Sequence, residues 1–195
     1  MLGGSFDPIH NGHLELAAAV LRESAVEEIR LLPAWKPPHK GGSITPAMHR
    51  VAMCQLAVQR DSRLKADTIE VDRQISYTAD TLRYLSTDNP DVQWSLVVGE
   101  DILRSLPYWK DSDSILRMAD LIISRRAGQN ANEDFDKLVQ YLQQRGGRIT
   151  VLRTVPDRIS SSQIRRLAAE GKSLSGLVPK EVVDYIAESG LYREE

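Results

Sequence analysis

Residues 3–13 read Gly3-Gly4-Ser5-Phe6-Asp7-Pro8-Ile9-His10-Asn11-Gly12-His13, and an apolar helical pattern begins directly after them at Leu14. Two glycines let the backbone come close to a bulky anion, with N–H groups that can point at it. The helix start near Gly12 adds unsatisfied N–H groups and the positive end of the helix dipole. His10 and His13 are three residues apart, so both can face the same anion. The segment therefore predicts a phosphate-binding loop, which we expect to be exposed.

Other interpretations of this loop stay open on the local pattern alone. A glycine-rich turn is often only a turn, and His10 and His13 can act as helix caps without chemistry. Two histidines at this spacing can also ligate zinc, but no third Cys or His lies near them in the sequence. The loop is neither a Walker loop, which needs Gly-Lys-Ser/Thr, nor a G-x-G-x-x-G fingerprint.

Beyond the loop, short apolar strands alternate with helices. Strands rich in Val, Ile and Leu are predicted at residues 26–33, 68–72, 92–98, 121–124 and 148–152. Helices are predicted from Leu14, with Leu14, Ala18, Leu21 and Ala25 on one face, and at residues 47–60 after a Thr45 cap, 132–144, 161–169 and 179–187. This alternation predicts one α/β domain over residues 1–195: a Rossmann-like, doubly wound, mainly parallel sheet with helices on both faces and a helical C-terminal part. Ligands bind such sheets beyond the carboxyl ends of the strands, where strand order reverses.

Composition limits the classes of partner. The net charge of −2 and the pI near 6.1 provide no global basic field for nucleic acid, so any phosphate site must be local. Cys54 is the only cysteine, which excludes an intrachain disulfide and favours a cytoplasmic location; we interpret it as a buried, unreactive thiol. The apolar run 16–21 is too short to span a membrane. Only Met1 and Leu2 precede the glycine pair, so we expect a very short first strand or a natural start upstream.

The loop motif Gly-Ser-Phe-Asp-Pro-Ile-His-Asn-Gly-His resembles the opening motif of the nucleotidyltransferase superfamily with the signature (H/T)-x-G-H. Within that superfamily the chain is similar to the bacterial nicotinate-mononucleotide adenylyltransferases, from residue 3 to about residue 192. The resemblance implies small-molecule substrates, ATP and nicotinate mononucleotide, without nucleic acid, a membrane or an obligatory protein partner. In this first motif it implies catalytic roles for His10 and His13, and ATP contacts from Gly4, Ser5, Phe6 and Gly12.

Three further motifs follow predicted strands or begin helices. PAWKPPHK at 33–40 is by itself an exposed basic loop, and the resemblance implies that Lys40 reaches the ATP phosphates. ISYTADTL at 75–82 is a helix start with Thr78 as N-cap, and the resemblance places its backbone against the pyridine carboxylate. GEDIL at 99–103, followed by LPYWK at 106–110, closes an apolar strand with Gly99 and Asp101. Trp109 by itself is more readily a core residue; the resemblance implies that it stacks on the pyridine ring, beside Tyr108.

The fifth motif, ISSSQIR at 159–165, begins a helix. Serine clusters at helix starts are usually structural caps, but with Arg165 one turn in, this one also forms a second anion seat. It resembles the superfamily motif Ile-Ser-Ser-Thr-x-Ile-Arg, which implies ATP contacts from Ser160, Ser161 and Ser162 and a catalytic role for Arg165. Arg126-Ala127-Gly128 is similar to the family's Arg-Pro-Gly turn with Pro replaced, and implies a mononucleotide contact for Arg126.

The implied reaction is in-line attack by the 5′-phosphate of the mononucleotide on the α-phosphorus of ATP. The nucleophile is already an anion, so catalysis reduces to positioning and charge stabilisation. His10 and His13 would hold the α-phosphate, and Lys40 and Arg165 the departing pyrophosphate. Mg²⁺ is expected with ATP, largely water-coordinated, and no metal site in the protein is expected. The rivals are a pantetheine-phosphate adenylyltransferase, an enzyme that prefers nicotinamide mononucleotide, and a non-catalytic nucleotide sensor on the same fold.

Overall fold

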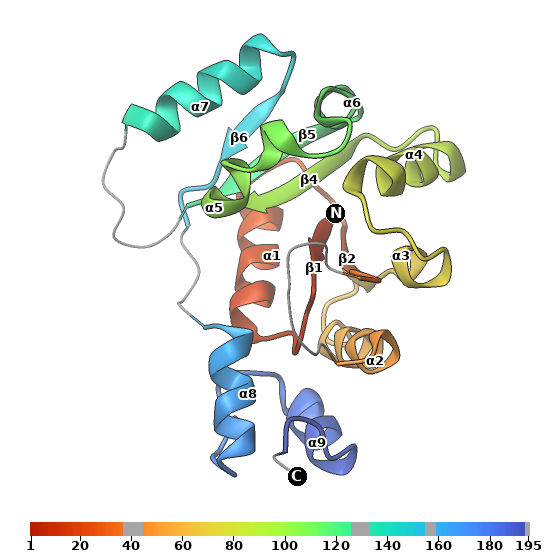
Figure 1. Cartoon of the computed structure of the whole chain (residues 1–195), viewed down its shortest axis with the longest axis vertical. Helices are drawn as coiled ribbons and strands as arrows, with labels where there is room; N and C mark the ends of the chain where they lie inside the picture. The colour runs from red at the N-terminus through yellow and green to blue at the C-terminus, as the bar shows by residue number, and fades with distance from the viewer. Residues whose placement is uncertain (37–44, 126–132, 155–158, 194–195) are drawn as a thin grey trace.

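A single parallel sheet organises the chain, as its computed structural model shows for residues 1–36, 45–125, 133–154 and 159–193. Within these residues six strands lie in the order β3-β2-β1-β4-β5-β6 (Figure 1). They are β1 (Leu2–Gly4), β2 (Ile29–Pro33), β3 (Leu64–Ala66), β4 (Trp94–Gly99), β5 (Ala119–Ser124) and β6 (Ile149–Val151). All five neighbouring pairs are parallel. The predicted doubly wound α/β fold is confirmed.

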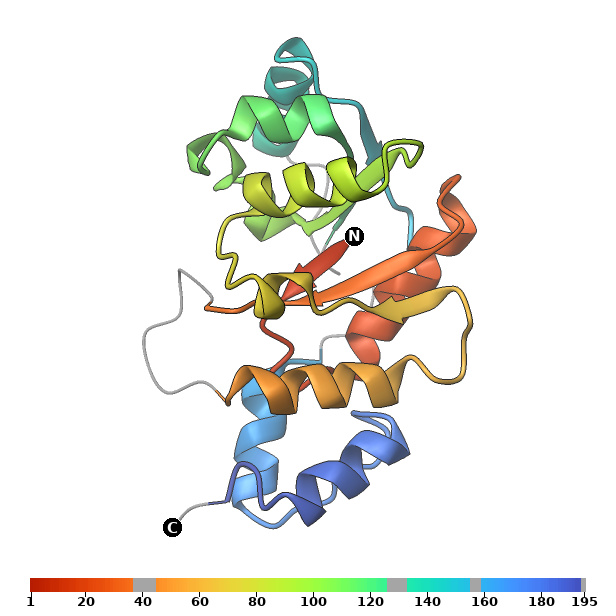
Figure 2. The ribbon, with the colours of Figure 1, turned by 90° about the vertical axis from the view of Figure 1, so that its right-hand side faces the viewer.

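Helices cover both faces of this sheet. They are α1 (Asn11–Glu23), α2 (Ala47–Ala57), α3 (Ile69–Asp72), α4 (Thr78–Asp88), α5 (Glu100–Leu103), the 3₁₀ turn η1 (Leu106–Tyr108), α6 (Ser112–Met118), α7 (Glu133–Gln144), α8 (Ser161–Ala169) and α9 (Lys180–Glu188). Figure 2 shows α4 on one side of the strands and α2, with α9 beneath it, on the other. The helical C-terminal part is therefore packed onto the layer that contains α2.

Two hydrophobic cores follow from the alternation of side chains along the strands. The first contains Leu2, Leu31, Val97 and Ile122 from the sheet, with Val20 of α1, Met53 of α2, Ile164 of α8 and Val182 of α9. The second contains Leu32, Leu96, Leu121 and Ile123, with Leu82 of α4, Ile115 of α6 and Leu142 of α7. Because strand neighbours such as Leu31 and Leu32 enter different cores, the sheet is buried on both faces, as a doubly wound fold requires.

One predicted strand is wrong. Residues 69–72 of that segment form the helix α3, with Thr68 as its N-cap, and the outer neighbour of β2 is β3, a strand three residues long that was not predicted. Local polar contacts explain the helix, because Asp67 Oδ1 accepts the N–H of Ile69 at 3.0 Å and Thr68 Oγ1 donates to Asp72 Oδ2 at 2.6 Å. Short polar side chains of this kind begin helical turns even where Ile and Val favour a strand.

Several helix details also differ from the predictions. Pro46 rather than Thr45 is the N-cap of α2, and Tyr77 rather than Thr78 is the N-cap of α4, both within the usual uncertainty of helix ends. The buried face of α1 contains Gly12, Ala17, Ala19 and Val20, while Ala25 is exposed beyond the helix end. The fully buried residues of α1 therefore differ from the predicted set.

Two sequence expectations about burial and membrane segments can be examined directly. Cys54 is fully buried, and burial raises the pKa of its thiol, so it is an unreactive core residue as predicted. Among the described residues, no helix is both long and apolar enough to cross a bilayer.

The strand order reverses between β1 and β4, which lie side by side at the centre of the sheet. Each ends in a glycine, Gly4 and Gly99, at the same edge. A crevice at such a reversal is where ligands of doubly wound folds bind. The fold therefore directs attention to the loops that follow these two strands.

Candidate active site

A cavity of about 370 Å³ lies where β1 and β4 end. Its lining includes Gly3, Gly4 and Ser5 from the first motif, Ser76, Tyr77 and Thr78 from the third, and Gly99, Tyr108 and Trp109 from the fourth. Three segments that are far apart in the sequence thus surround one space at the predicted edge of the sheet. Its size suits part of a nucleotide-sized ligand.

The glycine loop is open on one side and supported on the other. A Cβ atom on Gly3 would meet no atom within 4 Å, whereas one on Gly4 would lie 3.2 Å from the ring of Phe6. Phe6 is buried, with a positive φ of 45°, and its ring supports the loop from the core side. Of the ATP contacts predicted for Phe6, only backbone contacts are therefore compatible with the structure.

His10 and His13 lie together at the start of α1. The N–H of His10 donates to Nδ1 of His13 at 3.2 Å, so the neutral ring of His13 carries its proton on Nε2. The two rings are stacked, and the edge of the Phe6 ring supports His13 with 4.9 Å between centroids. The structure thus brings both predicted histidines to the helix start that offers an anion seat.

His10 is buried, which corrects the expectation of an exposed loop. It is 6% exposed, and burial lowers its pKa to about 4, so the ring is neutral near pH 7. Nδ1 of His10 makes no hydrogen bond within the described part of the chain. A neutral imidazole still offers one N–H donor, which is the form needed to hold a phosphoryl oxygen without a fixed positive charge.

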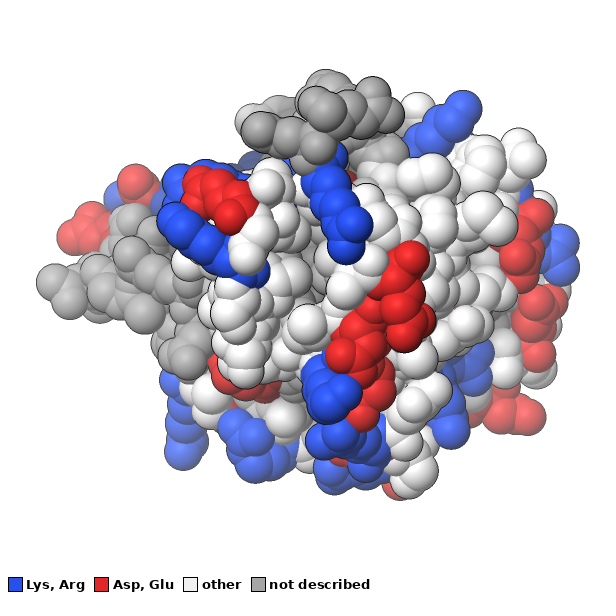
Figure 3. All heavy atoms as spheres, turned by 90° about the horizontal axis from the view of Figure 1, so that it is seen from below, with Lys and Arg blue, Asp and Glu red and all other residues white. Residues whose placement is uncertain are grey.

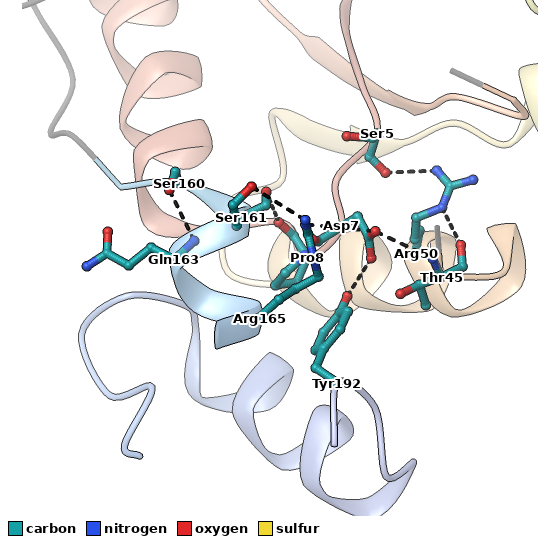
Figure 4. Close-up of polar contacts among 11 residues, drawn as sticks. Ser5, Asp7, Pro8, Thr45, Arg50, Ser160, Ser161, Gln163, Arg165 and Tyr192 are labelled. Carbon is teal, nitrogen blue, oxygen red and sulfur yellow. Dashed lines mark hydrogen bonds and ion pairs between the residues drawn. The ribbon is translucent and has the colours of Figure 1, made fainter. Parts of the chain in front are cut away.

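The fifth motif packs against the first one (Figure 4). Arg165 Nη1 donates to the backbone carbonyl of Asp7 at 2.7 Å, and Ser161 Oγ donates to that of Pro8 at 2.9 Å. Ser160 caps α8 by accepting the N–H of Gln163 at 3.2 Å, so its hydroxyl serves the helix. The two predicted anion seats therefore lie directly against each other.

Arg50 is a supporting residue that the sequence interpretation missed. It is fully buried on α2, and its guanidinium donates to the carbonyls of Ser5 at 2.8 Å, Thr45 at 2.9 Å and Ala34 at 2.7 Å. One side chain thus joins the loop after β1 to the segments after β2 and before α2. The available signal was an arginine on the same helix face as Met53, Cys54 and Ala57, where a charge needs partners.

The opposite end of the cavity is aromatic. The indole Nε1 of Trp109 donates to Ser105 Oγ at 3.0 Å, which orients the ring in the lining. Tyr108 is 88% exposed, and Thr78 is the first residue of α4. Gly99 caps the short helix α5, on which Asp101 is exposed. This end combines a flat aromatic side chain with the N-terminus of α4.

Two carboxyl groups near the aromatic end are neutralised in different ways. Asp80 pairs with Arg83 at 2.7 Å and with Lys110 at 2.9 Å. Glu70 lines the cavity and accepts a hydrogen bond from Thr81 Oγ1 at 2.9 Å, and burial raises its pKa to about 7. Cations thus balance one carboxylate, and a proton neutralises a large part of the other.

Lys40 and Arg126, assigned roles from the sequence, lie outside the described residues. Within residues 1–36, 45–125, 133–154 and 159–193, no three His, Cys, Asp or Glu side chains gather as metal ligands. On the face that carries α8 and α9, acidic and basic side chains are interspersed (Figure 3). Phosphate recognition on this molecule is therefore a matter of local groups.

Residues 1–167 match the cytidylyltransferase-like family. The probable nicotinate-nucleotide adenylyltransferase of Symbiobacterium thermophilum is 37% identical over 194 residues, which cover 98% of this chain and 93% of that protein. The corresponding Clostridium botulinum protein is 34% identical, with coverages of 99% and 98%. Nicotinic acid mononucleotide adenylyltransferase of Plasmodium falciparum, solved as its complex with NaAD, has a similar fold: the TM-score is 0.78 at 20% identity, with coverages of 98% and 95%.

Proposed function

Because the chain belongs to the nicotinate-nucleotide adenylyltransferases within the cytidylyltransferase-like family, we propose that it transfers the adenylyl group of ATP to nicotinate mononucleotide. The products are nicotinate adenine dinucleotide and pyrophosphate, in NAD biosynthesis. The observation that carries this function is the cavity at the carboxyl ends of β1 and β4, which is lined both by the glycine loop and by aromatic side chains. A dinucleotide-forming enzyme needs this pairing of a phosphate seat with a ring site.

The phosphate half of the reaction falls to the first and fifth motifs. An oxygen of the mononucleotide 5′-phosphate attacks the α-phosphorus of ATP, and the bond to the β-phosphate breaks with its electron pair leaving on pyrophosphate. His10 and His13 hold the α-phosphate oxygens as their charge grows, supported by backbone N–H groups of Gly4, Ser5 and Gly12. Arg165, with Ser161 and Ser162, binds the departing pyrophosphate, and we assign Lys40 to the same task.

The ring half falls to the aromatic end. Trp109 stacks on the pyridine ring, with Tyr108 beside it, a contact worth about 1 kcal/mol. The N–H groups at the start of α4, around Thr78, face the pyridine carboxylate, whereas those of Tyr108 and Trp109 donate to the carbonyls of Ser105 and Leu106 within their own turn. Gly99 and Asp101 lie beside the nucleoside part of the mononucleotide. Arg126 is assigned to the mononucleotide by sequence alone.

Mg²⁺ enters as the companion of ATP rather than as a resident ion. Asp7, a buried carboxylate within the phosphate loop, already accepts hydrogen bonds from Tyr192 at 2.8 Å and from the N–H of Thr45 at 3.4 Å. Because these hydrogen bonds already occupy the Asp7 carboxylate, the site fits a magnesium ion that would keep its water ligands and bind ATP oxygens. The ion would offset charge on the phosphates, while the protein residues orient them.

Such a metabolic enzyme, whose one cysteine is a buried free thiol, suits the cytoplasm.

Pyrophosphate release tests the function directly. Purified protein with ATP and Mg²⁺ is incubated with nicotinate mononucleotide, nicotinamide mononucleotide or phosphopantetheine, and with no acceptor as the control. Fastest release with nicotinate mononucleotide, and a dinucleotide product of matching mass, is the expected result. Fastest release with phosphopantetheine identifies the pantetheine enzyme instead, and ATP binding without release from any acceptor identifies a sensor.

A further inference from the structure

The carboxylate of Asp7 is held from two sides inside the phosphate loop. Asp7 is 3% exposed; the phenol of Tyr192 donates to its Oδ1 at 2.8 Å, and the N–H of Thr45 to its Oδ2 at 3.4 Å. Figure 4 shows the phenol reaching Asp7 from the turn that follows α9. A buried carboxylate needs such donors, and Tyr192 provides the shorter of the two.

Arg165 touches the same residue at a different atom. Its Nη1 donates to the backbone carbonyl of Asp7 at 2.7 Å but lies 4.0 Å from Oδ2, at the outer limit of an ion pair. The side chain of Arg165 is 35% exposed, so it remains accessible to a phosphate. A second cation near Asp7, Arg50, is fixed by its carbonyl partners. Of these two arginines, Arg165 is therefore the one that can move onto the Asp7 carboxylate.

The backbone of Tyr192 is held in an unusual conformation. Its φ is +64°, a left-handed value that is uncommon for any residue except glycine, and it follows Gly190 at φ +63°. The turn is fastened to α9, because the N–H of Leu191 donates to the carbonyl of Ile186 at 3.1 Å. Burial raises the pKa of the Tyr192 phenol, so it stays a hydrogen-bond donor. A strained residue that delivers one polar atom to a buried partner points to a specific role.

We propose that Tyr192 is a positioning residue for adenylyl transfer: by holding the Asp7 carboxylate, it keeps Arg165 available to the ATP phosphates. This role deepens the proposed function and rests on it. Without the phenol, the N–H of Thr45 at 3.4 Å would be the one remaining hydrogen bond to the Asp7 carboxylate from the described residues, and the charge of Asp7 would draw the Arg165 guanidinium into a direct ion pair. Arg165 would then be lost to ATP, while the ring end of the cavity would be unchanged.

The first test is Tyr192→Phe, which removes only the hydroxyl. The KM for ATP and the Kd for pyrophosphate are expected to rise about tenfold, the effect of losing one charge-assisted contact. The KM for the mononucleotide should stay within about twofold. Tyr185→Phe is the matched control: its hydroxyl bonds His49 Nδ1 at 2.9 Å from the same C-terminal region, away from the loop, and its loss should change neither constant.

Asp7→Asn separates positioning from simple fastening of the C-terminal turn. If the Asp7 charge captures Arg165, adding Tyr192→Phe to Asp7→Asn should change the KM for ATP by less than about twofold. The proposal is overturned if Tyr192→Phe raises the KM for ATP equally in the unmodified protein and in Asp7→Asn. It is also overturned if Tyr192→Phe alone leaves the KM for ATP and the Kd for pyrophosphate unchanged, a result that does not require Asp7→Asn to fold. Absence of turnover in the unmodified protein would instead contradict the proposed function.

Discussion

The imidazole rings of His10 and His13 are stacked, with 3.6 Å between their centroids and 22° between their planes. Because His10 is neutral near pH 7, the pair acts through N–H donors to the α-phosphate. Replacing either histidine with alanine is therefore expected to lower kcat by about 100-fold or more, the scale for a lost transition-state donor. Steady-state kinetics at saturating substrates is the measurement. His49→Ala, which removes a histidine that contacts Tyr185 instead of the loop, should leave kcat unchanged.

The stability of the two histidine variants should differ. His10 is buried, so His10→Ala leaves a void and is expected to cost about 1–3 kcal/mol in the free energy of unfolding. His13 is only partly buried and should cost less. Urea unfolding distinguishes the two, and near-normal turnover in a folded variant would remove that histidine from the mechanism.

Arg165→Ala is expected to raise the KM for ATP about tenfold or more, because it removes a charged donor from the phosphate seat. Affinity for the mononucleotide should stay nearly intact. Arg166→Ala is the control, since Arg166 is the next residue on α8. Its side chain is 71% exposed and makes a long ion pair with Glu170 at 4.0 Å. If titration shows that Arg165→Ala weakens only mononucleotide binding, the mononucleotide and not ATP occupies the site beside Arg165.

Nicotinate mononucleotide should be preferred over nicotinamide mononucleotide by about tenfold to several hundredfold in kcat/KM. Inward-facing N–H groups suit a carboxylate, whereas an amide leaves its own donors unpaired at about 1–3 kcal/mol each. Asp80 could have accepted those donors, but it is paired with Arg83 and Lys110. Equal kcat/KM values for the two mononucleotides would show that the wall of the pocket is not built of donors.

This preference should depend on pH through Glu70. Burial raises its pKa from 4.5 to about 7, so its negative charge appears in the cavity as the pH rises through 7. That charge repels the pyridine carboxylate but not the amide, and the ratio of the two kcat/KM values should fall between pH 6 and pH 8. Using the ratio cancels the titration of the phosphate that both substrates share. In Glu70→Gln the ratio should be flat, and an unchanged slope in this variant would exclude Glu70.

Glu70 also predicts the direction of a stability change. Between pH 4.5 and 7 the folded chain keeps a proton that the unfolded chain releases, so the free energy of unfolding falls as the pH rises across this window. The shift in pKa corresponds to at most about 3 kcal/mol. Urea unfolding at pH 5 and pH 8 should therefore show a loss in the unmodified protein that is smaller in Glu70→Gln.

Arg50→Lys is expected to lower kcat about tenfold or more. Lysine keeps the charge but cannot reach the carbonyls of Ser5, Thr45 and Ala34 together, so the phosphate loop loses its alignment with its neighbours. Met53→Ala is the control: it lies one turn further on the same buried face and costs about 2–5 kcal/mol in stability. If Arg50→Lys and Met53→Ala lose the same activity per folded molecule, the role of Arg50 is structural only.

The fold could be predicted largely from local patterns, because buried parallel strands are runs of Val, Ile and Leu wherever they occur. Residues 68–72 were misassigned since Asp67 and Thr68 outweigh the strand preference of Ile69 and Val71, and β3 is too short to show a pattern. In the site, the motif around His10 and His13 was recognisable because glycines, turn residues and a helix start are contiguous. The burial of His10 was not, because burial depends on distant segments.

Arg50 and Tyr192 were missed for the same reason. The partners of Arg50 lie 45 residues away at Ser5 and 16 away at Ala34, and Tyr192 lies 185 residues from Asp7. No local spacing encodes such pairs, and a buried charge in a helix signals only that partners exist. Arg165 could be assigned to an anion seat from the sequence, but its hydrogen bond to the Asp7 carbonyl could not be predicted, because the two residues are 158 positions apart.

The support of the phosphate loop by the end of the chain has a consequence for protein synthesis. A ribosome makes the loop first and three of its supports much later: Ser161, Arg165 and Tyr192 follow their partners in the loop by 153, 158 and 185 residues. A nascent chain thus carries a recognisable nucleotide motif that cannot yet be held in shape. Products of a broken messenger RNA would lack the same supports. A nascent chain that stops before α8 is therefore expected to lack all three of these contacts to the phosphate loop.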